Sequence, residues 1–173
     1  MQVNEPNNEF PWMTEEIKNQ IRNRDKIVKE EDINGLFQLS DNDDFSIALY
    51  EILSNRCNFN PDTLNPTHRT LFLCMLLENA GQADHILGFL QEDFPKYADE
   101  TINALNKIDA TKSSEIIKQA VQLLPKDGSW FFETANESSL NLMSRLDSEF
   151  SSYPDGLMCD LYRKFADNHR SDF

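Results

Sequence analysis

Apolar residues recur every three or four positions along most of the chain, a spacing typical of amphipathic helices. Ile17 and Ile21 belong to a helix predicted over residues 14–30, with Thr14 as its N-cap. A second helix is predicted over residues 41–57, because its apolar side chains share one face. A short connection is expected to join these two helices.

That connection and the start of the second helix carry their own signals. Asn34 and Gly35 are expected to break the first pattern, and residues 36–39 to form a short turn tucked into the core. Ser40 followed by Asp43 predicts a capping box, with aspartate in place of the usual glutamate or glutamine.

The segment 71–77 is apolar at every position, which predicts a central helix buried on all sides. Asn65 followed by Pro66 marks its start, since asparagine caps helices and proline fits the first helical position. Ala80 and Gly81 are expected to interrupt this helix. The apolar run is too short to cross a membrane.

Further helices are predicted after Pro95, before Pro125, around residues 140–150 and around residues 157–165, with an aromatic-anchored loop at 126–132. No segment alternates apolar and polar residues as a strand would. The sequence therefore predicts an all-α fold: one compact domain of about eight helices over residues 14–173, preceded by a short N-terminal arm, residues 1–13.

The charge balance narrows the possible partners. The 173 residues include 30 Asp and Glu but 16 Lys and Arg, so the formal net charge is −14. Direct nucleic-acid binding is not expected, because it requires a basic surface that neutralises phosphates. Two explanations stay open: the acids keep the protein soluble, or they bind a basic partner.

The acids are also unevenly placed. Between Lys29 and Arg56 there is no basic residue, and a similar gap separates Arg69 from Lys96. An ordinary solvated helix face intersperses opposite charges. We therefore predict a partner-binding acidic surface made of Glu30, Glu31, Asp32, Asp41, Asp43, Asp44, Glu51, Asp84, Glu92, Asp93, Asp99 and Glu100, with residues 147–160 as a further contributor.

No pattern indicates catalysis, a metal or a cofactor. His68, His85 and His169 do not pair at metal-ligand spacing and are expected to be surface or capping residues. The acids at 41–44 lack the glycine and distal glutamate of a calcium loop. We expect no enzymatic activity and no cofactor.

The cysteines and the N-terminus bear on localisation. Cys57, Cys74 and Cys159 share no metal-like spacing and lie beside apolar residues, as core side chains in a reducing compartment do. No basic segment followed by an apolar run indicates a signal peptide. We expect a cytoplasmic protein.

Three stretches from residue 64 onward resemble a bacterial family of acidic, all-helical proteins named after a DNA mimic. They are LNPTHRTLFLCMLLE (64–78), YADETINALNKIDATKSSEIIKQAVQLLP (97–125) and LDSEFSSYPDGLMCDLYRKFADNH (146–169). Many members carry an Asn-Asn-Gly-Gly-Phe turn, whereas the equivalent positions here are residues 82–86, QADHI. No role of that turn is carried over.

The resemblance implies a DNA mimic, a homodimer that occupies the DNA-binding surface of a bacterial helix-turn-helix transcriptional regulator and keeps it off its operator. A different class stays open: an acidic immunity or anti-toxin protein that inhibits a basic toxin or nuclease. Shape separates the two, because a mimic needs extended rows of charge and an inhibitor needs a compact patch.

Overall fold

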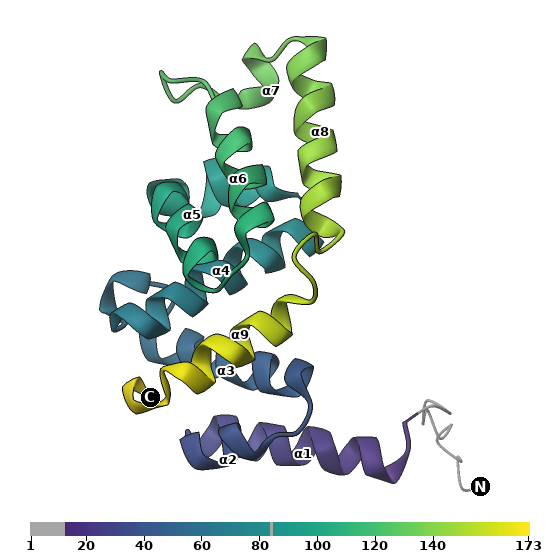
Figure 1. Cartoon of the computed structure of the whole chain (residues 1–173), viewed down its shortest axis with the longest axis vertical. Helices are drawn as coiled ribbons and strands as arrows, with labels where there is room; N and C mark the ends of the chain where they lie inside the picture. Colours follow the sequence, from purple (N-terminus) through teal and green to yellow (C-terminus); the bar gives the residue numbers. More distant parts are fainter. Residues whose placement is uncertain (1–12, 84) are drawn as a thin grey trace, which may run out of the picture.

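The computed structural model describes residues 13–83 and 85–173, and within these ranges it contains helices and no strand (Figure 1). The all-α prediction is therefore confirmed. The helices are α1 (Glu15–Glu30), α2 (Ile33–Gln38), α3 (Asn42–Cys57), α4 (Pro66–Ala83), α5 (Ala98–Lys107), α6 (Thr111–Leu123), α7 (Phe131–Thr134), α8 (Glu137–Ser151) and α9 (Met158–Asn168).

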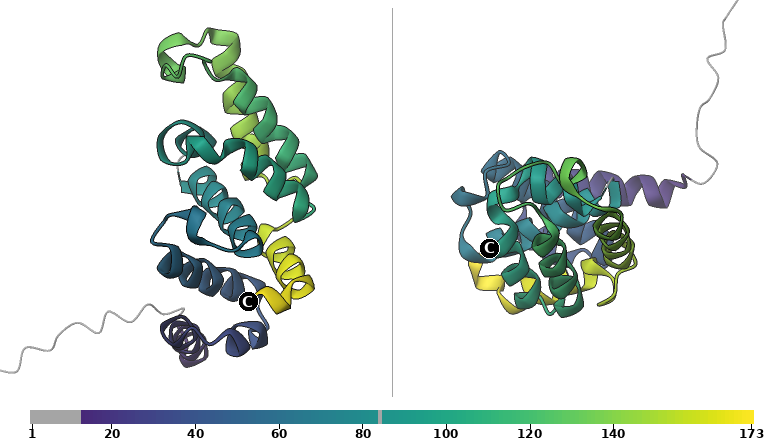
Figure 2. Two further views of the ribbon diagram at one scale, coloured as in Figure 1. Left: turned by 90° about the vertical axis from the view of Figure 1, so that its left-hand side faces the viewer. Right: turned by 90° about the horizontal axis from the view of Figure 1, so that it is seen from above.

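Short helical turns fill several connections. They are the 3₁₀ turns η1 (Pro61–Thr63), η3 (Pro95–Tyr97) and η4 (Arg170–Asp172), and the π-helical turn η2 (Gly88–Asp93). The helices stack along one long axis, with α1 and α2 at one end and α7 at the other (Figures 1 and 2). The predicted arm lies almost entirely in residues 1–12, outside the described residues.

Of the two N-caps predicted for α1 and α3, the first is confirmed and the second is displaced by one residue. The Thr14 hydroxyl accepts a hydrogen bond from the backbone N–H of Ile17, as predicted. At α3 the capping box on Ser40 is wrong by one residue. The cap is Asp41, whose carboxylate accepts from the N–H of Asp44 at 2.9 Å. Aspartate caps as well as serine does, and Asp41 immediately precedes the first helical residue.

The first helical pattern does break, but at Glu31 and Asp32, whereas Asn34 and Gly35 lie inside the short helix α2. The carboxylate of Asp32 caps this helix by accepting from the N–H of Gly35 at 2.9 Å. A Cβ at position 35 would come within 2.5 Å of that carboxylate, so glycine leaves room for the cap. Leu36 and Phe37 are buried, which confirms that this segment packs into the core.

Helix α4 is the centre of the packing. Every side chain from 71 to 77 is buried, and the helix contacts α3, α5 and α8. The expected interruption at Ala80 and Gly81 is wrong, because α4 continues to Ala83. Gly81 is instead a point of close approach, since a Cβ there would lie 2.9 Å from the Phe150 ring of α8.

The chain returns at its C-terminal end to cover α3. Helix α9 packs against α3, far from it in sequence (Figure 1). The Arg163 guanidinium donates to the carbonyl oxygens of Leu39 at 2.8 Å and Phe37 at 3.0 Å, and it lies 4.8 Å from the centre of the Phe45 ring. The Arg163 side chain therefore connects α9 both to the segment before α3 and to the first turn of α3.

The last residues bury a histidine that the sequence predicted at the surface. His68 is 5% exposed, and its ring lies 4.6 Å from the Phe173 ring. The prediction is wrong for this histidine because η4 folds back over the start of α4, where Asp172 accepts a hydrogen bond from Thr67. His85 does accept from the N–H of Gly88 as a cap, and His169 stacks on Phe165 at the end of α9.

The remaining local predictions are mostly confirmed. Asn65 caps α4 through the N–H of His68 at 2.8 Å. The three cysteines are free, with Cys57 and Cys74 buried and Cys159 half-buried. Phe131 anchors the predicted aromatic loop, although α7 begins at this residue. No helix in the described part of the chain is long and apolar enough to span a membrane.

Replacing Gly81 with alanine is expected to lower the free energy of unfolding by about 1–3 kcal/mol, because the new methyl group would overlap the Phe150 ring. Urea denaturation measures the change. Gly88→Ala is the control, since a Cβ there meets nothing closer than 3.9 Å. An equal effect of both substitutions would contradict the close packing of α4 on α8.

A second prediction concerns acid stability. Burial lowers the pKa of His68 to about 4, and the positive charge of Arg56 acts in the same direction. An unfolded histidine titrates near pH 6.5, so the stability due to neutral His68 is complete above pH 6.5 and lost as the pH falls toward 4. We expect the wild type to lose about 3 kcal/mol more than His68→Phe across this window.

Denaturant midpoints and slopes at several pH values between 4 and 7 would measure that difference. His169→Gln serves as the control, because His169, which follows α9, is only half-buried, whereas His68 is buried. Parallel pH profiles for the wild type and His68→Phe would show that the buried ring does not control acid stability.

Candidate functional site

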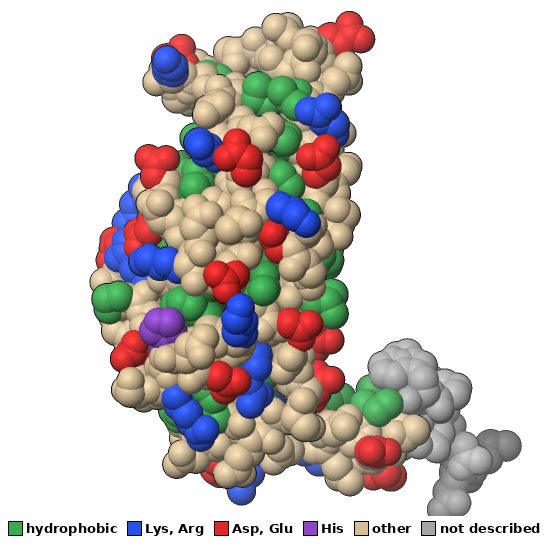
Figure 3. Space-filling model, in the orientation of Figure 1, with side chains coloured by type: hydrophobic (Ala, Val, Ile, Leu, Met, Phe, Trp, Pro, Cys, Tyr) green, Lys and Arg blue, Asp and Glu red, His purple; other side chains and the backbone are tan. Residues whose placement is uncertain are grey.

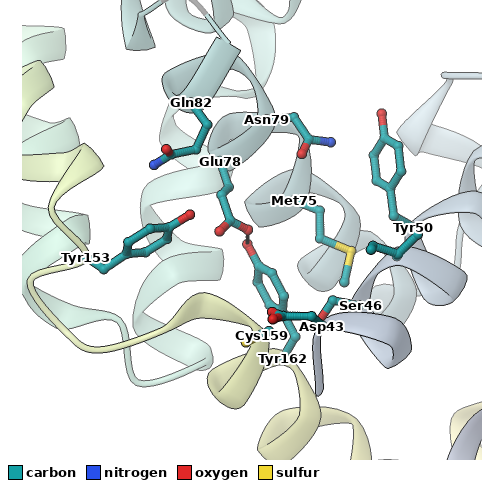
Figure 4. Close-up of a pocket in the computed structure, with 11 residues that line it drawn as sticks. Asp43, Ser46, Tyr50, Met75, Glu78, Asn79, Gln82, Tyr153, Cys159 and Tyr162 are labelled. Carbon is teal, nitrogen blue, oxygen red and sulfur yellow. Dashed lines mark hydrogen bonds between the residues drawn. The ribbon is translucent and has the colours of Figure 1, made fainter. Parts of the chain in front are cut away.

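Helices α3, α4 and α9 and the turn after α8 border a groove of about 590 Å³ (Figure 4). Helix α3 contributes Asp43, Ser46 and Tyr50 to its walls. Helix α4 contributes Met75, Glu78, Asn79 and Gln82. The turn after α8 and helix α9 contribute Tyr153, Cys159 and Tyr162. No lysine or arginine is among the residues that line the groove.

The groove lies where α3 is bordered by α4 on one side and by the returning α9 on the other. Met75, Glu78, Asn79 and Gln82 repeat at three- and four-residue intervals, so they share one face of α4. At Met75 this face of α4 is buried in the core. Nearer the C-terminal end of the helix, at Asn79 and Gln82, the same face is exposed to solvent in the groove.

Glu78 is the charged residue that α4 contributes to the groove. The Tyr162 hydroxyl donates to its carboxylate at 2.9 Å, and Tyr153 also interacts with it through its hydroxyl (Figure 4). Burial raises the pKa of Glu78, and the charge of Asp43 raises it further, while the two tyrosines oppose this shift. The site thus holds a carboxylate in a poorly solvated position.

The tyrosines respond to the same environment. Burial and the charge of Glu78 raise the pKa of Tyr153 to about 12 and that of Tyr162 well above 10. Both phenols therefore stay protonated near neutral pH and act as hydrogen-bond donors to Glu78.

A second group of acids lies where α3 and α9 begin. Burial raises the pKa of the Cys159 thiol to about 12, with a hydrogen bond to Asp43 and the charge of Asp160 adding to the effect. The side-chain amide of Asn42 donates to Asp160 at 2.7 Å. Asp43 of α3 thus lies near Glu78 of α4 and also near Cys159 of α9, which is next to Asp160.

Six of the predicted surface residues have no ion pair within the described part of the chain. Glu30 ends α1, Glu51 lies on the exposed side of α3, and the others are spread over α3, η2 and α5. The six are Glu30, Asp43, Glu51, Glu92, Asp93 and Asp99.

Other predicted acids are engaged within the protein. Glu31 pairs with Arg56 at 2.9 Å and Asp44 with Arg24 at 3.1 Å, while Glu100 pairs with Arg69. Asp32 and Asp41 serve as helix caps. Asp84 lies outside the described residues. The gap in basic residues along the sequence is therefore partly filled in space by arginines from other helices.

The predicted acids do not all lie in one place. Asp43 and Glu51 lie on α3, whereas Asp99 lies in the first turn of α5, which is further along the long axis (Figure 1). Acidic side chains gather at the right-hand edge of Figure 3, over the region where α3 and α9 begin, and basic and acidic groups alternate elsewhere on this face. Residues 147–160 contribute Asp160 to the gathering, because Asp147 and Asp155 bind backbone N–H groups.

The sequence reasoning missed Glu78 and the tyrosines around it. One signal for Glu78 was available: it is the first acid after the apolar run 71–77, on a helix predicted to be buried all round. Tyr153 and Tyr162 are far from Glu78 in the sequence and reach it only through the return of the C-terminal segment. No group of three or more His, Cys, Asp or Glu side chains suited to a metal ion occurs in residues 13–83 and 85–173.

Comparison with known proteins gives one match. The family model described as DMP19-like protein matches residues 62–169, which include α4 to α9 and the groove residues from Met75 onward. Neither the curated proteins nor the solved structures contain a match.

Substituting Glu78 by glutamine is expected to raise the free energy of unfolding at pH 7. Glutamine keeps an oxygen for Tyr162 but has no charge to bury. Because folding raises the pKa of this acid above its usual 4.5, the wild type loses stability as the pH rises from 4.5 through the folded-state pKa. The advantage of the variant should therefore be absent below pH 4.5 and present at pH 7.

Urea denaturation at pH 4 and pH 7 checks this, with exposed Glu133→Gln as the control. If Glu78→Gln were less stable at pH 7, or if its advantage were the same at both pH values, then burial of the carboxylate would not be the controlling effect.

Proposed function

Because the chain belongs to the DMP19-like family, we propose that it acts as a DNA mimic that binds the DNA-binding surface of a bacterial helix-turn-helix transcriptional regulator. Binding would keep the regulator off its operator. The observation that supports the proposal most is the gathering of carboxylates without ion pairs around the start of α3 and α9.

The electrostatics of duplex DNA suit this role. A helix-turn-helix protein fixes its position on DNA largely through Lys and Arg contacts to phosphates. Carboxylates held on rigid helices offer a comparable potential to the same side chains. Asp43 lies in the first turn of α3, and Asp160 in the first turn of α9, so packed helices hold both in place.

The amount of charge favours a homodimer as the acting form. Duplex DNA carries two charges per base pair, so a net charge of −14 equals about seven base pairs. Two copies would match about fourteen, enough for much of one operator. We propose a homodimer that acts in the cytoplasm by occupying the regulator, without catalysis and without a cofactor.

The groove supports a second candidate function. It is a compact acidic cavity, which suits the inhibition of one cleft in a basic toxin or nuclease. Such an immunity-type inhibitor would bind its target whether or not DNA was present. The response to competing DNA therefore separates the two functions.

A pull-down from bacterial lysate, with the purified protein as bait, tests the proposal. A helix-turn-helix regulator released both by salt and by added duplex DNA would support mimicry. A basic partner released by salt but not by DNA would instead support the immunity-type function. The absence of any salt-sensitive partner would contradict both.

Combining Asp43→Asn with Glu51→Gln should weaken binding to the recovered regulator about tenfold at low salt, and should reduce the dependence of affinity on salt. Both side chains are exposed and lack ion pairs in the described part of the chain, so folding stability should change by less than about 1 kcal/mol. Titration calorimetry at two salt concentrations measures both effects.

The matched control removes two charges at the far end of the molecule, with Glu133→Gln and Glu137→Gln in α7 and α8. If both double variants weakened binding equally, net charge rather than the surface near α3 would determine the affinity. Unchanged affinity in the α3 variant would place the binding surface on other elements.

A further inference from the structure

We infer that the groove between α3, α4 and α9 is a binding pocket for a guanidinium group, and that it receives one arginine side chain of the partner protein. The pocket itself is argued from its chemistry. Only the statement that the arginine belongs to the partner's DNA-binding surface rests on the proposed function.

The first reason is a partly buried carboxylate without a cation. Glu78 receives hydrogen bonds from tyrosines, but no lysine or arginine lines the groove. Charged side chains withdrawn from water are normally paired, because desolvation without a counter-charge is unfavourable. Elsewhere in this chain the fold does supply such cations, for example Arg24 to Asp44. A bound cation would complete the site.

The second reason is the arrangement of acceptors. Asp43 reaches the groove from α3 and Glu78 from α4, so two carboxylates border one cavity (Figure 4). The Ser46 hydroxyl, on the same wall as Asp43, is buried and has no hydrogen-bond partner in the described residues. Guanidinium carries five N–H donors in a fixed plane and can serve several such acceptors at once.

The third reason is the apolar lining beside these acceptors (Figure 4). Tyr50 and Met75 form one wall, and the Tyr50 ring is held by stacking on Phe72, with centroids 5.7 Å apart. A guanidinium plane stacks on such a ring, and the methylene groups of an arginine pack against thioether and aromatic carbon. A hydrated metal ion would gain nothing from this lining, and it prefers six or more oxygen ligands.

The pocket can be tested without knowledge of the partner. Isotope-labelled protein is titrated with N-acetyl-arginine methylamide while its NMR spectrum is recorded. We expect a dissociation constant in the millimolar range and shifts confined to groove residues such as Ser46 and Tyr50. The neutral citrulline analogue, which has nearly the same shape, should not bind, and the lysine analogue should bind more weakly.

Variants locate the binding site. Glu78→Gln should weaken binding of the arginine compound at least fivefold, and so should exposed Asp43→Asn, which serves if the first variant folds poorly. Glu133→Gln should leave it unchanged. Equal binding of the arginine and citrulline compounds, or shifts outside the groove, would overturn the inference.

The regulator recovered by pull-down separates this inference from the proposed function. If it binds Glu78→Gln as tightly as wild type and DNA still displaces it, the pocket is not part of the interface and the pocket inference fails for the partner, whereas mimicry stands. If the arginine compound binds the groove but DNA displaces no partner, mimicry fails and the pocket stands.

Discussion

The fold depends on the enclosure of α4. Its residues 71–77 are apolar in every direction, so the helix can be stable in water only when other helices cover all of its sides. Helices α3, α5 and α8 provide that cover, and α9 extends it by packing on α3. The same enclosure leaves Glu78, the first acid after this run, only partly exposed to water. The candidate site is therefore a consequence of how the core closes around one helix.

The sequence predicted the helices well because their apolar spacing is a local property. It failed where a distant segment decides the outcome. Gly81 suggested a break, but it is the place where α8 packs closely through Phe150. His68 was expected at the surface, but it is buried because Phe173 returns to cover it. Neither contact can be read from neighbouring residues, since each joins positions roughly 70 to 105 apart.

The acidic surface was predictable only in part for the same reason. A stretch without basic residues does not remain unneutralised if the fold brings arginines from elsewhere, as Arg24 and Arg56 do for Asp44 and Glu31. Asp43 and Glu51, on the same helix as Asp44, have no such arginine and stay without ion pairs among the described residues. Helix packing thus determines which acids form ion pairs and which do not, and this could not be predicted from the order of charges along the sequence.

Exposed carboxylates and a partly buried carboxylate contribute to binding in different ways. Exposed charges act over distances up to the screening length, so they speed the approach of a basic partner and weaken steeply with salt. A carboxylate such as Glu78 acts only on a group that enters the groove, but water and salt screen it less. A protein that carries both could attract many basic surfaces and still hold firmly only one that presents an arginine at the right position. Selectivity would then depend on the groove, and the rate of encounter on the surrounding acids.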